Sequence, residues 1–119
     1  AIGISGNWGS GKTSFLKSMK KQMDATDYDI VLLGCGAYGF PLAAHAKRMG
    51  KQAVHLGGAL QLLFGIRGKR WDNPEFGAKS VCAKGGYGQL FNTHWVYPGE
   101  NEKPKRFSQV EEGCYWGKN

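Results

Sequence analysis

Up to Trp71, short apolar runs alternate with glycine-rich turns and amphipathic stretches. Residues 30–33 (IVLL) are apolar throughout, which is typical of a strand buried on both faces of a parallel sheet. Residues 13–23 instead have the spacing of an amphipathic helix, whose apolar face carries Phe15, Leu16, Met19 and Met23. Strands are predicted at residues 1–5, 30–33 and 52–56, and helices at residues 13–23, 41–50 and 59–66. Gly50 is expected to close the second of these helices as its C-cap.

The order of these elements, βαβαβα, indicates an α/β fold with parallel strands and helical crossovers. We therefore expect a Rossmann-like, three-layer open parallel sheet. After Trp71 the chain is rich in glycine, lysine and aromatic residues, and only a short helix within residues 87–96 is predicted. At 119 residues the chain has room for one domain, which comprises a strand and helix (1–23), a central unit (28–71) and an irregular, aromatic-rich C-terminal third (72–119).

The formal net charge of +7 predicts a surface that attracts anions such as nucleotides, nucleic acid or acidic membranes. Cys35, Cys82 and Cys114 are too widely spaced for a disulfide framework or a zinc knuckle, and we expect reduced thiols in a cytoplasmic protein. No apolar run approaches the ~20 residues of a membrane span, and Ala1 opens an apolar segment rather than a charged signal peptide.

Residues 6–13, GNWGSGKT, satisfy the pattern G-x-x-x-x-G-K-[ST] between a predicted strand and a predicted helix. In such a loop the glycines leave backbone N–H groups free to surround phosphates, the lysine neutralises the terminal phosphates and the hydroxyl reaches Mg²⁺. The residues expected to bind ATP or GTP are Gly6, Gly9, Gly11, Lys12 and Thr13, and Thr13 would also hold the metal.

The string GNWGSGKTSFL, with tryptophan between the glycines, resembles the phosphate loop of the KAP family of P-loop NTPases. Hydrolysis also needs a carboxylate at the end of an apolar strand. The predicted strands end instead in Gly34 and Gly57, whereas Asp27 and Asp29 precede their strand, at the wrong edge of a parallel sheet. This loop is therefore expected to bind phosphates without competent hydrolysis.

A second glycine turn follows residues 30–33. Gly34, Gly36 and Gly39 have G-x-G-x-x-G spacing between a strand and a helix, where an anion can approach backbone N–H groups. Tyr38, inside this turn, is either a stacking platform for a base or sugar or a partly exposed turn residue. No acid follows the next strand to hold a ribose hydroxyl, so NAD is not expected.

The segments DIVLLGCGAYGFPLAAHAKRMGKQAVHLGGALQLLFGIRGKRW, FNTHWVYP, KPK and VEEGCYW occur in this order. Over about residues 19–116 the chain thus resembles a family of bacterial proteins related to the GT-D-type glycosyltransferase fold. The resemblance implies a Rossmann-like half-domain whose strand ends, with the turn at Gly57 and Gly58, line a nucleotide-sugar site. The chain lacks the N-terminal half with an acidic D-x-E motif that such enzymes carry, so the transferase would be truncated and catalytically incomplete.

Three single residues are further candidates for the site. His55 lies at the carboxyl end of a predicted strand, the edge where open α/β sheets bind ligands, and is a candidate catalytic residue. Gln61 places an amide on an apolar helix face, where it binds either a ligand or backbone groups. Glu111 and Glu112 are the only adjacent carboxylates in the sequence. Glu111 is the candidate general base, and the alternative is that both side chains are solvated acids on the surface.

Lys69, Arg70 and Trp71 combine two cations with an aromatic ring, which suits the phosphate and base of a nucleotide, although solvated charges over a half-buried ring are the alternative. The leading hypothesis is a nucleotide-sugar-binding, glycosyltransferase-like domain. The alternative is a P-loop module that holds ATP or GTP phosphates. A third hypothesis is a basic domain that binds nucleic acid or protein, because basic and aromatic residues interleave from Arg67 to Arg106.

Overall fold

The computed structural model describes residues 12–76 and 86–117 of the chain. The predicted strand at residues 1–5 and the glycines of the loop at residues 6–11 lie outside these described residues, as does Cys82. The chain divides into two compact units, Ala1–Leu60 and Gln61–Asn119.

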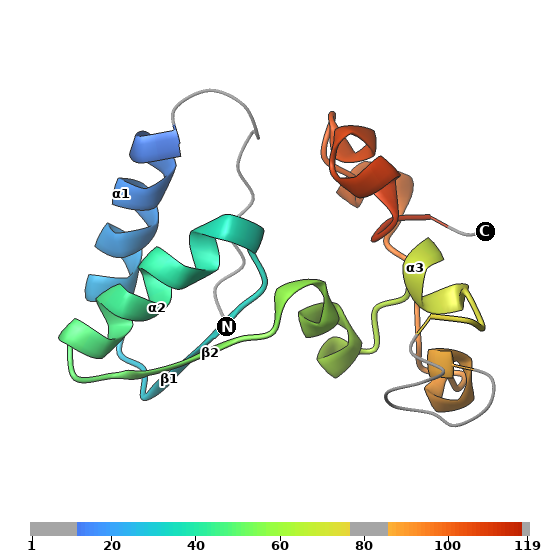
Figure 1. The fold of residues 1–119 in the computed structure, drawn as a ribbon, viewed down its shortest axis with the longest axis horizontal. Helices are drawn as coiled ribbons and strands as arrows, with labels where there is room; N and C mark the ends of the chain where they lie inside the picture. Colours follow the sequence, from blue (N-terminus) through green and yellow to red (C-terminus); the bar gives the residue numbers. More distant parts are fainter. Residues whose placement is uncertain (1–11, 77–85, 118–119) are drawn as a thin grey trace. The chain divides into compact units, whose positions relative to one another are not determined.

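The first unit contains a pair of parallel strands and two helices (Figure 1). Its elements are α1 (Lys12–Asp24), β1 (Ile30–Leu33), the 3₁₀ turn η1 (Gly36–Tyr38), α2 (Gly39–Arg48) and β2 (Gln52–His55). Ile30 pairs with Gln52 and Leu33 with His55, so the two strands are in register along their whole length. The α/β class is confirmed, but the described residues show a small two-stranded sheet rather than a full three-layer Rossmann-like sheet.

The core of the first unit lies between the sheet and the two helices. Its buried side chains are Met23, Leu33, Leu42 and Ala46. Leu16 and Met19 of α1 pack against this cluster, which confirms the apolar helix face predicted from the sequence. In Figure 1, α1 and α2 lie side by side on the same side of the strands, and α2 is the crossover between the parallel strands β1 and β2.

The opposite face of the sheet is exposed in the first unit. Ile30 and Leu32 of β1 keep 51% and 41% of their surface accessible, and Val54 of β2 keeps 44%. The prediction that residues 30–33 are buried on both faces is therefore wrong for this unit. Side chains alternate between the two faces of a strand, and both helices pack on the face that carries Val31 and Leu33.

The end of α2 follows the pattern predicted from Gly50. This glycine has a φ of +75°, in the left-handed region. The Gly50 N–H donates to the carbonyl oxygen of Lys47 at 3.0 Å, and the Lys51 N–H donates to the carbonyl oxygen of Ala46 at 2.9 Å. This pair of bonds is a Schellman motif, which satisfies carbonyls that the helix end would leave unpaired.

The second unit is built mainly from 3₁₀ turns. Helix η2 (Gly57–Phe64) leads into it, and its further elements are α3 (Lys69–Asp72), η3 (Gly86–Leu90), η4 (Glu100–Glu102), η5 (Phe107–Gln109) and η6 (Glu111–Gly113). The α-helix expected at residues 59–66 is thus a 3₁₀ helix. It ends before Gly65, which has a φ of +66°. Of the helix expected within residues 87–96, only the part up to Leu90 forms.

Two side-chain clusters hold the second unit together. Trp71, which is 3% exposed, packs in edge or tilted contact with Phe76, Tyr87 and Tyr115. Arg67 lies over the rings of Phe91 and Tyr97 at 4.4 and 4.5 Å, and its Nη2 donates to the Asp72 carboxylate at 2.9 Å. No helix among the described residues has the length and apolar character needed to cross a membrane.

Candidate functional site

Helix α1 begins at Lys12, so Lys12 and Thr13 occupy its first turn directly after the glycines at residues 6–11. The first N–H groups of a helix have no partner within the helix, and they carry the positive end of its dipole. The first turn of α1 contains no acidic residue, and Thr13 is exposed. The backbone and charge of this helix end therefore suit an anion.

An aromatic contact joins this helix end to the turn after β1. The ring of Phe15, in the first turn of α1, lies 4.9 Å from the ring of Tyr38, centroid to centroid, at an interplanar angle of 55°. The start of α1 and the second glycine turn consequently lie at the same edge of the sheet. The sequence pattern identified Tyr38 as a candidate but did not predict that Phe15 would contact it. The feature of the sequence that could have indicated this contact is the position of Phe15 one helical turn after Lys12.

The second glycine turn is held by His55. The Nδ1 and Nε2 atoms of this ring lie 3.1 Å from the carbonyl oxygens of Leu33 and Gly36, respectively. The Gly57 N–H donates to Nδ1 at 3.4 Å. Because both ring nitrogens already face backbone groups, the contacts support a positioning role for His55 rather than the catalytic role considered from the sequence.

The glycines of this turn also have packing roles. A Cβ atom on Gly39 would lie 2.4 Å from the His55 ring, and one on Gly34 would lie 2.7 Å from the Leu60 side chain and 2.9 Å from the Gly57 carbonyl. Gly36 and Gly57 adopt φ angles of +54° and +57°. The G-x-G-x-x-G spacing is therefore accounted for by close packing and turn geometry before any ligand is considered.

Gln61 has backbone partners within the second unit. Its Nε2 donates to the carbonyls of Ile66 at 3.2 Å and Tyr115 at 3.4 Å. Of the two roles considered for this amide, the contacts support the one in which it joins backbone segments. Its neighbour Gly58 lies in the same helix, η2.

The cation–aromatic candidates lie in α3. Trp71 is buried in the aromatic cluster, so its ring does not form the exposed plate that a nucleotide base requires. The guanidinium group of Arg70 donates to the Glu111 carboxylate and to the Tyr115 hydroxyl. Glu111 is thus part of an ion pair, so its carboxylate already has a partner within the second unit. Lys69 is exposed at the start of the same helix.

The described cysteines are Cys35 and Cys114, and both are free thiols. Burial raises the pKa of the Cys35 thiol above its ordinary value, and burial is also the largest cause of the raised pKa of Cys114. Both thiols are therefore protonated at neutral pH and are poor nucleophiles.

Within residues 12–76 and 86–117, no three His, Cys, Asp or Glu side chains gather in a way that could hold a metal ion. A magnesium ion held at Thr13 would take its other oxygen ligands from phosphate and water.

Comparison with known proteins gives one match. Residues 1–110 match the family model described as the KAP family P-loop domain. The match extends far beyond the residue 6–16 string that suggested this family, and it includes the central region that resembled the GT-D-type glycosyltransferase fold. No curated protein and no solved structure matches the chain, and no comparison supports the glycosyltransferase family.

Proposed function

Because the chain belongs to the KAP family of P-loop domains, we propose that residues 6–13 bind the phosphates of ATP or GTP. The observation that carries this proposal is the start of α1 at Lys12. A phosphate loop needs its lysine and hydroxyl residue in the first helical turn, where the free N–H groups and the helix dipole also favour an anion.

The residues of this helix end have distinct roles in the proposal. Lys12 neutralises the terminal phosphates, and the Thr13 hydroxyl completes the coordination of a magnesium ion that arrives with the nucleotide. The ring of Tyr38 packs on Phe15 in the first turn of α1, and in this proposal Tyr38 contacts the bound nucleotide. The positive charge of the chain raises the local concentration of such anionic ligands.

We further propose that this chain binds nucleotide without competent hydrolysis. The two described strands are followed by Gly34 and Leu56, so neither delivers a carboxylate to the edge where α1 begins. Asp29 stands immediately before β1, at the opposite edge of the sheet. Hydrolysis needs an acidic residue that helps to hold the metal and a group that positions water.

Titration calorimetry with Mg·ATP and Mg·GTP tests the proposal. Replacing Lys12 by alanine should weaken binding by about ten- to a hundredfold, because it removes a charged hydrogen bond to phosphate. Lys17→Ala is the matched control, since Lys17 is an exposed lysine of the same helix beyond its first turn. Equal affinities of the wild type and Lys12→Ala would refute phosphate binding by this loop.

The same titration tests the nucleotide-sugar interpretation. That interpretation rests on the turns at Gly34–Gly39 and at Gly57–Gly58, which packing already explains. Binding of a UDP-sugar that survives Lys12→Ala would support it over the P-loop proposal, whereas binding of ATP or GTP that is lost in Lys12→Ala supports the P-loop. In a hydrolysis assay we expect no phosphate release above the level of Lys12→Ala.

A further inference from the structure

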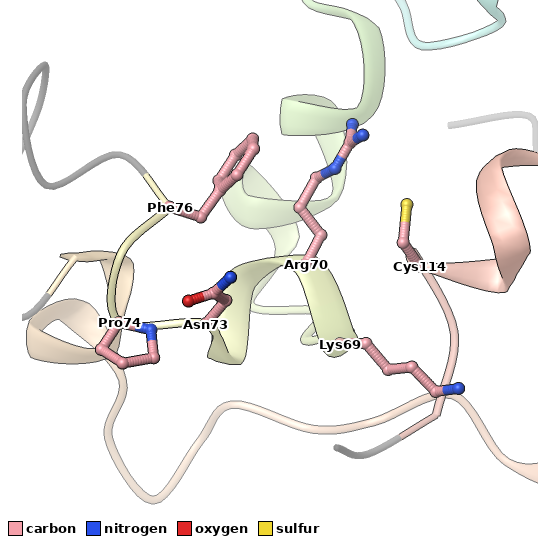
Figure 2. A pocket seen from close by; sticks show the side chains of 6 residues that line it. All are labelled: Lys69, Arg70, Asn73, Pro74, Phe76 and Cys114. Carbon is pink, nitrogen blue, oxygen red and sulfur yellow. The ribbon is translucent and has the colours of Figure 1, made fainter.

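A cleft of about 370 Å³ lies beside α3 in the second unit (Figure 2). The described residues that line it are Lys69, Arg70, Asn73, Pro74, Phe76 and Cys114. Two of these side chains are cations and, among the described residues that line the cleft, none is a carboxylate. The cleft is wide open to solvent and its lining is positive, with Glu111 beside it as the ion-pair partner of Arg70, so the class of ligand that its charge suits is an anion.

Arg70 presents its guanidinium group in a fixed orientation. The group lies 5.1 Å from the ring centroid of Phe76 and 4.7 Å from that of Tyr115. Figure 2 shows the Arg70 and Phe76 side chains on the same side of the α3 turn. Its Nη1 donates to the Tyr115 hydroxyl and its Nη2 to the Glu111 carboxylate, so a phosphate in the place of Glu111 would receive a charge-assisted hydrogen bond from Nη2.

The present partner of Arg70 is an internal anion that can be displaced. The Glu111 side chain keeps 53% of its surface exposed, so it would regain water easily if it left the arginine. Glu111 and Glu112 have φ angles of +47° and +57°, a left-handed conformation that is unfavourable for residues with a Cβ atom. The turn that carries Glu111 is therefore strained, and its carboxylate also accepts a hydrogen bond from the Tyr115 hydroxyl at 3.2 Å.

We propose that the cleft binds a small phosphate monoester with a flat ring, of the nucleoside monophosphate type. The phosphate replaces the Glu111 carboxylate on Arg70, with Lys69 as a second cation. The ring lies against Phe76, which is 38% exposed, and Pro74. This site consists entirely of residues from the second unit and does not depend on phosphate binding at residues 6–13.

The test is a calorimetric titration of the full chain with AMP, carried out in a Lys12→Ala background so that the P-loop does not contribute. Arg70→Gln should weaken AMP binding about tenfold or more, because a charge-assisted contact to phosphate is lost. Glu111→Gln should strengthen it about two- to fivefold, because the competing ion pair is removed. Arg106→Gln, which changes an exposed arginine that is not among the described residues lining the cleft, should leave the affinity unchanged.

The opposite effects of Arg70→Gln and Glu111→Gln separate an anion site from a purely structural ion pair, since a structural pair would weaken in both variants. Weaker AMP binding in Glu111→Gln, or unchanged binding in Arg70→Gln, would overturn the proposal. Separate titrations with inorganic phosphate and with adenosine test the two halves of the ligand. AMP should bind more tightly than either, and inorganic phosphate that binds as tightly as AMP would refute the contact between the adenine ring and Phe76. If Arg70→Gln does not fold, the Glu111→Gln result alone decides.

Discussion

At the scale of single residues, His55 decides the shape of the second glycine turn. Its ring touches the end of β1 and η1 and leaves no room for a side chain at Gly39. Through Tyr38 and Phe15, this turn is in contact with the first turn of α1. A histidine that looked like a candidate catalyst in the sequence therefore supports the region where we place the nucleotide.

The contact between His55 and Gly39 gives a first prediction. Gly39 has helical angles, φ −60° and ψ −43°, so its backbone alone would accept alanine. The added Cβ would meet the His55 ring at 2.4 Å, and Gly39→Ala should cost about 1–3 kcal/mol in urea denaturation. In a His55→Ala background the same substitution should be neutral or stabilising. An equal cost in both backgrounds would contradict the contact.

A second prediction concerns the Tyr97 hydroxyl, which donates to Asp72 at 2.7 Å. Burial, with this hydrogen bond as the next cause, raises the pKa of Tyr97 above its ordinary value of 10.0. A raised folded-state pKa means that the stabilisation is present below pH 10 and is lost as the pH rises through the folded pKa. The stability difference between the wild type and Tyr97→Phe should therefore shrink as urea denaturation is repeated from pH 8 to about pH 11. A constant difference would argue against the pKa shift.

At the scale of elements, periodicity and turn chemistry predicted the first unit well. The helix at residues 13–23, the strands at residues 30–33 and 52–56 and the glycine end of the second helix all appear within a residue or two of the expected bounds. Each of them is encoded locally, by a repeat of apolar positions or by a glycine that must adopt a positive φ. The 3₁₀ form of η2 was missed, because GGALQLLF is apolar almost throughout and has no polar face to indicate its period.

At the scale of elements, the prediction concerns Gly50, which ends α2 with a positive φ. A Cβ atom on Gly50 would meet no heavy atom within 4 Å, so any cost of Gly50→Ala comes from the left-handed backbone alone. We expect a loss of about 1–2 kcal/mol of unfolding free energy. Gly88→Ala is the control, because a Cβ there also meets nothing and Gly88 is not among the glycines with positive φ. Equal effects of the two substitutions would show that the φ angle is not the cause.

At the scale of the whole molecule, the described residues show a packing centre within each of the two units. In the first unit Leu42 is fully buried among Met23, Leu33 and Ala46, and in the second Trp71 is buried among aromatic rings. The Nε1 atom of Trp71 has no hydrogen-bond partner among the described residues, which is an energetic cost within that core. In the basic segment, Arg67, Arg70 and Lys103 pair with carboxylates of the second unit, so these three charges are already partly neutralised.

One substitution tests the packing centre of each unit. Leu42→Ala should cost about 2–5 kcal/mol because it leaves a cavity, whereas Trp71→Phe should cost less because it also removes the unpaired N–H group. Urea denaturation measures both losses, and a cost of Trp71→Phe equal to or above that of Leu42→Ala would contradict the cost assigned to the unpaired N–H group.

The sequence by itself determined the phosphate-loop pattern at residues 6–13, the helix that follows it and the parallel pair of strands. These features depend on local spacing and on backbone conformations that only certain residues adopt. Only the tertiary structure decided that His55 braces the glycine turn, that Trp71 is buried and that Arg70 pairs with Glu111 across 41 positions of the chain. Such contacts depend on which distant segments pack together when apolar surface is buried, and the local spacing of residues does not predict that packing.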